Sequence, residues 1–94
     1  MPNYIIKIKD KYFEWSTIVD APITNSMTIE ELERYISVSQ GDEGIRKLPE
    51  RMVRVNAKGC SSLRDDLGAL LESNRAGENE TSITAEEIYE RYRY

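Results

Sequence analysis

The stretch YFEWSTIVDAPIT, residues 12–24, has the alternation and the composition of a β-strand that runs into a turn. One face of this strand carries Phe13, Trp15, Thr17 and Val19. The opposite face includes the polar residues Glu14, Ser16 and Asp20. We expect the first face to pack into the core and the polar groups to form an ordinary solvated face of the sheet.

Two further segments predict the partners of this strand. Residues 3–9 alternate as well, with Tyr4, Ile6 and Ile8 on one face, and a short polar break joins them to the first strand as a hairpin. Residues 51–57 place Val53 and Val55 in alternation with more polar side chains. That spacing predicts a third strand in the middle of the chain.

Two helix starts are marked by copies of the T-x-x-E capping box, in which a threonine and a glutamate each bind the other's backbone N–H. Thr28 and Glu31 form the first box, and Thr84 and Glu87 form the second. Gly41 is expected to end the first helix, because glycine readily adopts the left-handed conformation that stops a helix.

A further helix is predicted between these two, with Ser61 or Ser62 as its N-cap. Its apolar face is formed by leucines at helical spacing, Leu63, Leu67, Leu70 and Leu71. Together the elements predict one α+β domain over residues 1–94. It has a three-stranded, mostly antiparallel sheet in the order ββαβαα, with the helices packed on one face.

The composition excludes several classes of function. The net charge of −4 argues against a general nucleic-acid-binding protein, which needs surplus cations. The chain contains no histidine, so the usual general base, the common nucleophile pairs and the common zinc ligand are missing. We therefore expect a protein that is not an enzyme and that uses neither a metal nor a cofactor.

The sequence also predicts where the protein works. No apolar run approaches the ~18 residues of a membrane span, and no basic-then-apolar leader opens the chain. The single cysteine fits a reducing compartment. We expect a cytoplasmic protein without a membrane partner. A domain of this size has a modest core, so a homo-oligomer interface would help to stabilise it.

The segment KGCSSLR, residues 58–64, is the first candidate site. A glycine and two serines lie just before a predicted helix, where free backbone N–H groups can bind an anion. The predicted ligand-binding residues are Lys58, Gly59, Ser61, Ser62 and Arg64, with Trp15 as a flat wall for stacking. The alternatives are an ordinary turn with a serine N-cap, and a tryptophan that belongs to the core.

The tail YERYRY, residues 89–94, is the second candidate site. Tyrosine and arginine interleave there, and both residue types dominate protein-binding hot spots. The predicted partner-binding residues are Tyr89, Arg91, Tyr92 and Arg93. The alternative is that the tyrosines complete the core while the arginines are solvated.

Acidic pairs and the cysteine have two interpretations each. The pairs at residues 42–43 and 65–66 could supply a magnesium site, but acids in the first turn of a helix are also favoured by its macrodipole. Cys60 lies near Lys58, and a nearby cation lowers the pKa of a thiol. Without a histidine partner we do not expect a catalytic cysteine.

Four segments, YFEWSTIVDAPIT, MTIEEL, KGCSS and NRAG, give the chain its resemblance to a known group. It resembles small proteins, mostly of uncharacterised function, that tailed bacteriophages encode. The resemblance implies a counter-defence factor that acts in the host cytoplasm against bacterial immunity. Such factors sequester nucleotide second messengers or, as anti-CRISPR proteins do, cover the surface of an effector complex.

These observations lead to one expectation with two alternatives. The leading expectation is a non-enzymatic binding protein that sequesters a small anionic nucleotide signal, using convergent donors beside a flat apolar wall. The first alternative is an anti-CRISPR-like inhibitor that binds a host defence protein. The second is a small enzyme acting on a nucleotide. None of the three involves bulk nucleic acid.

Overall fold

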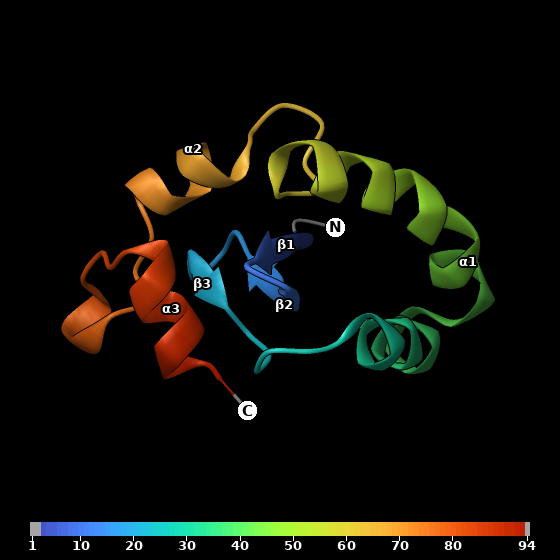
Figure 1. Ribbon diagram of the computed structural model, residues 1–94, viewed down its shortest axis with the longest axis horizontal. Coiled ribbons are helices and arrows are strands. Elements are labelled where there is room, and N and C mark those ends of the chain that lie inside the picture. Colours follow the sequence, from blue (N-terminus) through green and yellow to red (C-terminus); the bar gives the residue numbers. More distant parts are fainter. Residues whose placement is uncertain (1–2, 94) are drawn as a thin grey trace.

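The computed structural model describes residues 3–93. Three antiparallel strands form the sheet in the order β1-β2-β3, namely β1 (Asn3–Ile8), β2 (Lys11–Ser16) and β3 (Ala21–Pro22). The helices that follow are α1 (Ile29–Lys58), α2 (Leu67–Glu72) and α3 (Ala85–Arg91), with a short 3-10 helix, η1 (Glu78–Glu80), before α3. The predicted α+β class with a three-stranded antiparallel sheet is confirmed (Figure 1).

The helices cover both faces of the sheet, whereas the sequence predicted one covered face. Ile6, Phe13 and Trp15 pack in one cluster with residues of α2 and α3. Ile5 and Tyr12, on the opposite face, pack in a second cluster with residues of α1. Figure 1 shows the strands between α1 on one side and α2 and α3 on the other. The physical reason is that β1 carries isoleucine on both faces, so burial of both is favoured.

The segment predicted as the third strand, residues 51–57, is part of helix α1. Val53, which the strand interpretation used, is 69% exposed. Leu48, Met52 and Val55 recur instead at the i, i+4 and i+7 spacing of a helix and pack in the α1 cluster. This helical period outweighs the shorter alternation, and the sheet is completed by the two-residue strand β3, which pairs with the end of β2.

Helix α1 bends at Gly41, whose backbone has φ 68° and ψ −157°. This conformation is accessible almost only to glycine. Figure 1 shows the two helical segments running in different directions from the bend. Gly41 therefore interrupts the helix, where the sequence predicted that it would end it. The bend brings Ile36 of the first segment and Leu48 of the second into the same core cluster.

We expect Gly41→Ala to lower the free energy of unfolding by about 1–3 kcal/mol, because alanine is strained in this conformation. No atom lies within 4 Å of the new Cβ, so the effect reports backbone strain alone. Gly68→Ala is the matched control, since its new Cβ meets only Asp66 Oδ1 at 3.5 Å inside helix α2. That control should gain about 0.5–1 kcal/mol. Urea denaturation measures both, and equal effects would contradict the role of Gly41.

Both predicted capping boxes are present. The Thr28 hydroxyl accepts from the Glu31 N–H at 3.2 Å, and the Glu31 carboxylate accepts from the Thr28 N–H at 2.8 Å. Thr84 and Glu87 form the second box with distances of 3.1 and 2.9 Å. Hydrogen bonds to its carboxylate from the Thr84 backbone N–H and the Thr84 side chain lower the pKa of the Glu87 carboxyl group. The starts of α1 and α3 therefore follow from local sequence.

Helix α2 begins later than predicted. The Ser62 hydroxyl accepts from the backbone N–H groups of Arg64 and Asp65 at 3.2 and 3.1 Å, and it closes a turn that does not continue into a helix. Asp66 is the N-cap, and its carboxylate accepts from the Ala69 N–H at 2.9 Å. An ionised aspartate also interacts with the helix dipole, which a serine hydroxyl cannot do as strongly.

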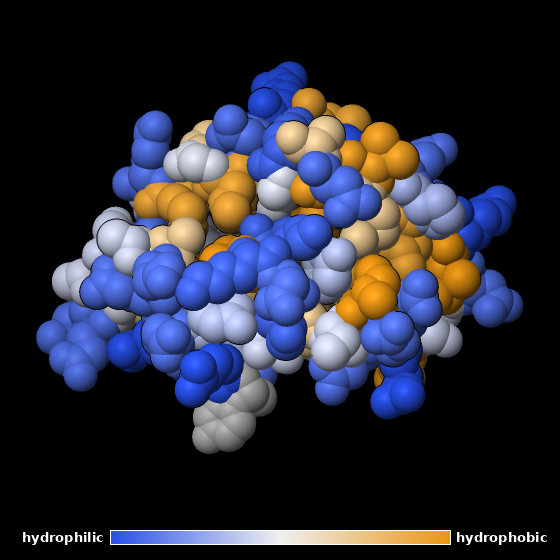
Figure 2. Space-filling view, in the orientation of Figure 1, coloured by the Kyte–Doolittle hydropathy of each residue, from blue (hydrophilic) through white to orange (hydrophobic). Residues whose placement is uncertain are grey.

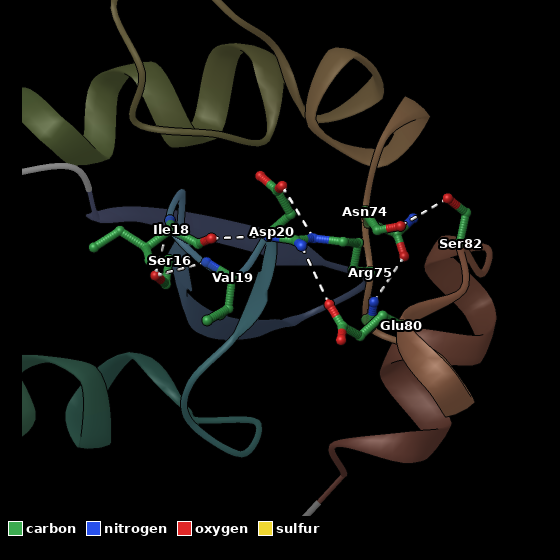
Figure 3. A network of polar contacts seen from close by, with 9 residues as sticks. Ser16, Ile18, Val19, Asp20, Asn74, Arg75, Glu80 and Ser82 are labelled. Atoms are coloured by element: carbon green, nitrogen blue, oxygen red, sulfur yellow. Dashed lines mark hydrogen bonds and ion pairs between the residues drawn. The ribbon is translucent and has the colours of Figure 1, made fainter.

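Asn74 and Arg75 hold the loop between α2 and α3 (Figure 3). The buried side chain of Asn74 makes four hydrogen bonds to backbone groups. Arg75 reaches the turn after β2, where it pairs with Asp20 at 3.4 Å and donates to the Ile18 carbonyl at 2.9 Å. It also pairs with Glu80 at 3.2 Å. This loop is thereby tied to the end of the sheet.

Candidate ligand-binding site

A cavity of about 830 Å³ lies between the hairpin, helix α1 and the loop that follows α1. Cavities of roughly 300–1,000 Å³ are typical of small-molecule sites. The lining residues are Asn3, Tyr4, Glu14, Ser39, Gln40, Glu43, Gly44, Lys47, Glu50, Arg51, Arg54, Ser61, Ser62, Leu63, Arg64 and Asp65. Most of them are polar or charged, so the cavity suits a polar ligand.

Glu14 is the most buried charged group of the cavity, with 4% of its surface exposed. The strand register places it opposite Ile5, on the face of the sheet that is turned toward α1. Its Oε2 accepts from the Asn3 side-chain amide at 2.7 Å, but no described group donates to Oε1. A buried carboxylate oxygen without a donor is unusual and costly. The sequence predicted that Glu14 lies on a solvated face of the strand. In the structure this residue is buried, and one of its carboxylate oxygens has no donor among the described residues.

Tyr35, on the first segment of α1, lies close to this carboxylate. Burial raises the pKa of the Tyr35 hydroxyl, and the charge of Glu14 raises it further. A hydrogen-bonding interaction between the two side chains also raises the pKa of Tyr35, but its geometry falls short of a hydrogen bond to Glu14 Oε1. Tyr35 is therefore affected by the Glu14 carboxylate but leaves Oε1 without a hydrogen bond.

Arg51 and Arg54 bring two half-buried guanidinium groups to the cavity from the second segment of α1. Burial lowers the pKa of Arg51, and the nearby Glu14 carboxylate opposes that effect. Arginine stays protonated in proteins, so both groups are charged. Among the described residues, Arg51 makes one long hydrogen bond, to Gln40 at 3.5 Å, and Arg54 donates through Nε to the Ser61 carbonyl at 2.7 Å. Most of their donors are therefore available to a ligand.

Three of the predicted ligand-binding residues, Ser61, Ser62 and Arg64, line this cavity. The Ser61 N–H donates to the Ile5 carbonyl at 2.9 Å, and its hydroxyl accepts from the Ile5 N–H at 2.8 Å. These bonds hold the loop along the edge of β1. A serine hydroxyl that accepts a backbone N–H keeps its own proton to donate, so both serines remain possible donors to an anion.

The other three predicted ligand-binding residues lie elsewhere. Lys58 is in the last turn of α1, and Gly59 is the left-handed C-cap of that helix, with φ 81°; neither lines the cavity. Trp15 is 0% exposed, in the cluster on the opposite face of the sheet. Its prediction as a stacking wall is wrong, because alternation along β2 separates it from Glu14.

The charges of the cavity are distributed unevenly with depth. The lining includes four basic residues, Lys47, Arg51, Arg54 and Arg64, and four acidic ones, Glu14, Glu43, Glu50 and Asp65. Glu43, Glu50 and Asp65 are exposed, and Glu43 is paired with Lys47 at 3.4 Å. The buried part therefore combines one carboxylate with two guanidinium groups, and the exposed acids are screened by water.

The tail predicted to bind a partner is largely packed against the core. Tyr89 and Tyr92 are half-buried beside the α2–α3 cluster, and the Tyr92 hydroxyl donates to the Ala76 carbonyl at 3.3 Å. Arg91 and Arg93 are exposed. Tyr89 and Tyr92 therefore pack against the core, as the alternative interpretation of the tail predicted, and the two arginines are accessible to solvent.

Cys60 is buried, and its backbone forms an isolated antiparallel β-bridge with Ile6 of β1. Burial raises the pKa of its thiol, with a smaller opposing effect from the Ser62 backbone N–H. A thiol in this state is a poor nucleophile at neutral pH. Within residues 3–93, no three His, Cys, Asp or Glu side chains converge as a metal site would need, and no helix has the length and apolar character to cross a membrane.

Sequence reasoning missed Glu14, Arg51 and Arg54. Glu14 was assigned to a solvated face, and both arginines fell in the predicted strand. One available signal was the helical spacing of Lys47, Arg51 and Arg54 at i, i+4 and i+7, which predicts a basic stripe on one side of α1. For Glu14, the apolar residues on both faces of the neighbouring strand indicated that neither face is solvated.

Comparisons with protein-family models, with curated proteins and with solved structures find no match to this chain.

Proposed function

We propose that this protein binds a small anionic nucleotide in the cavity between the hairpin and α1, and that it holds this ligand without transforming it. The observation that carries the proposal is that the buried Glu14 carboxylate and the half-buried guanidinium groups of Arg51 and Arg54 line one cavity of ligand size. A nucleotide has an anionic phosphate end and a base with polar edges, and this site offers partners for both.

The guanidinium groups suit the phosphate end. Arginine binds phosphate oxygens through paired, charge-assisted hydrogen bonds, and half-burial strengthens them. Arg64 adds a third guanidinium, whose side chain has no partner among the described residues. The Ser61 and Ser62 hydroxyls lie on the same loop and can add neutral donors.

Binding without chemistry fits the residues at hand. The chain has no histidine, and the one cysteine is buried with a raised pKa. The resemblance to small tailed-phage proteins extends the proposal to a counter-defence role in the host cytoplasm, in which a nucleotide signal of bacterial immunity is sequestered.

Two alanine variants in the segment of residues 58–64 test this proposal, one at Arg64 and one at Lys58. A ligand at 100 times its Kd stabilises the folded state by about 2.7 kcal/mol. For a domain of this size that corresponds to a rise in Tm on the order of 10 °C. We expect cyclic mononucleotides or dinucleotides to produce such a rise, and Arg64→Ala to reduce it by about half or more.

Lys58→Ala is the matched control, because Lys58 is a cation six residues away that does not line the cavity. The control should keep the full ligand-induced rise. Differential scanning fluorimetry across a panel of cyclic nucleotides measures it. If no nucleotide in the panel moves the Tm of the unmodified protein, the proposal is wrong; if Lys58→Ala and Arg64→Ala behave alike, the site has been misplaced.

A second candidate, an anti-CRISPR-like inhibitor of a host defence protein, is favoured by apolar side chains on the surface. Val38 and Val53 of α1 and Leu63 of the following loop are 83%, 69% and 81% exposed. Figure 2 shows apolar surface over α1 and α2, interrupted by charged groups. This candidate predicts that Val53→Ser weakens capture of the defence complex and leaves nucleotide binding unchanged. Self-association through the same residues would appear as a larger mass in sedimentation analysis.

A further inference from the structure

The unsatisfied oxygen of Glu14 indicates what the base end of the ligand must offer. A carboxylate has about four lone-pair positions, and Asn3 occupies one of them. Oε1 is buried and receives no hydrogen bond from any described residue. A ligand that enters the cavity restores this lost hydrogen bonding only if it brings donors. Acceptors placed there would be repelled by the negative charge.

The four common bases differ in the donors that they present side by side. Guanine carries N1–H and the exocyclic N2 amino group next to each other on its Watson–Crick edge. Adenine and cytosine each place a ring-nitrogen acceptor beside their amino group, and uracil flanks its one N–H with two carbonyl oxygens. Only guanine can donate two parallel hydrogen bonds to a single carboxylate without placing an acceptor against it.

We infer that the cavity selects guanine nucleotides, with the Glu14 carboxylate accepting from N1–H and N2–H of the base; this inference rests on the proposed nucleotide-binding function. Asn3 acts as a positioning residue, because its amide holds Oε2 at 2.7 Å and thereby fixes the plane of the carboxylate. Arg51 and Arg54 then take the phosphate end of the same ligand. Glu14 therefore recognises the base, and the two arginines bind the phosphate group.

Burial makes this selection strong. In water the N–H donors of guanine already have partners, so an exposed carboxylate would add little. Glu14 is 4% exposed and its Oε1 is buried without a hydrogen-bond partner among the described residues, so a base that cannot donate leaves this oxygen unsatisfied in the complex. A site with buried hydrogen-bonding groups rejects an analogue that lacks the matching group far more strongly than an apolar pocket can.

Isothermal titration calorimetry with three probes tests the inference: 3′,5′-cyclic GMP, cyclic AMP and cyclic IMP. The inosine base keeps N1–H and lacks the amino group, so it isolates one of the two donors. We expect the unmodified protein to bind cyclic GMP about 10-fold or more tighter than cyclic AMP, with cyclic IMP between them. In Glu14→Gln the amide replaces one acceptor with a donor, and the preference should fall to within about 3-fold.

Glu33→Gln is the matched control, because Glu33 is exposed on α1 and does not line the cavity; it should keep the preference. A preference for cyclic GMP that survives in Glu14→Gln would overturn the assignment to this carboxylate. Equal binding of all three probes by the unmodified protein would overturn guanine selection and leave nucleotide binding intact. Binding of none would overturn both. If Glu14→Gln fails to fold, the ranking of the probes on the unmodified protein decides alone.

Discussion

Asn74→Ala is expected to lower the free energy of unfolding by about 3–5 kcal/mol, one of the largest effects of any single substitution in this chain. The Asn74 amide donates to the Leu71 and Ile83 carbonyls, both at 2.8 Å. Its oxygen accepts from the Ala76 and Ile83 N–H groups at 3.2 and 3.0 Å. The side chain is 1% exposed, so alanine would remove all four bonds and leave the Ile83 carbonyl and the Ala76 and Ile83 N–H groups without these partners, while the Leu71 carbonyl keeps the Ser73 and Asn74 N–H groups.

Two variants make this prediction specific. Asn74→Asp keeps one acceptor but places a second carboxylate oxygen against the Leu71 and Ile83 carbonyls, so we expect a loss at least as large as that of the alanine variant. Asn56→Ala is the control on an exposed position of α1, where alanine's helix propensity should make it neutral or up to about 0.7 kcal/mol more stable. Urea denaturation monitored by Trp15 fluorescence measures all three. A loss below about 1 kcal/mol for Asn74→Ala would show that the loop does not depend on this side chain.

Arg51→Ala is expected to weaken nucleotide binding by about 2–5 kcal/mol, or roughly 30-fold or more in Kd. Arg51 is half-buried and interacts electrostatically with Glu14, and its one hydrogen bond to a described residue is the long contact to Gln40. Its remaining donors are therefore available to the phosphate group, and alanine would also remove a positive charge that interacts with the Glu14 carboxylate. Arg51→Lys should recover part of the affinity, because lysine restores the charge and loses the paired donor geometry.

Arg34→Ala controls for the loss of a positive charge on α1. Arg34 is exposed on the first helical segment and does not line the cavity. Calorimetry at two salt concentrations should show an unchanged Kd for this control at each salt. If Arg34→Ala and Arg51→Ala weaken binding equally, the attraction is a general effect of net charge, and Arg51 has no specific contact with the ligand.

The parts of the fold that sequence predicted are those fixed by neighbouring residues. The hairpin of residues 3–16 and the two capping boxes depend on contacts between positions a few residues apart, so the local pattern was sufficient. The bend at Gly41 was recognised as a break because glycine is needed there locally. What the sequence could not show was whether the chain would resume as a helix beyond it.

The errors arose where long-range packing decides between two local patterns. The alternation of Val53 and Val55 favoured a strand, but burial of Leu48 and Val55 against the sheet favoured a helix. Glu14 was placed on a solvated face because polar residues in alternation usually are solvated. Only the position of α1 over that face shows that it is buried.

The candidate site was predicted in part for the same reason. Ser61, Ser62 and Arg64 were predicted because a glycine-serine turn has a local signature. Arg51 and Arg54 join them only because the bend in α1 returns its second segment to the sheet. Such convergence of distant residues depends on tertiary structure, which the pattern of one sequence does not contain.

The most direct test of the account is a backbone amide NMR titration of the protein with cyclic GMP, which locates the bound ligand residue by residue. We predict chemical shift changes that centre on Glu14, Arg51, Arg54, Ser61 and Ser62 and that leave α3 unchanged. Shift changes confined to α3, or none at saturating ligand, would contradict the claim that the cavity between the hairpin and α1 binds a nucleotide.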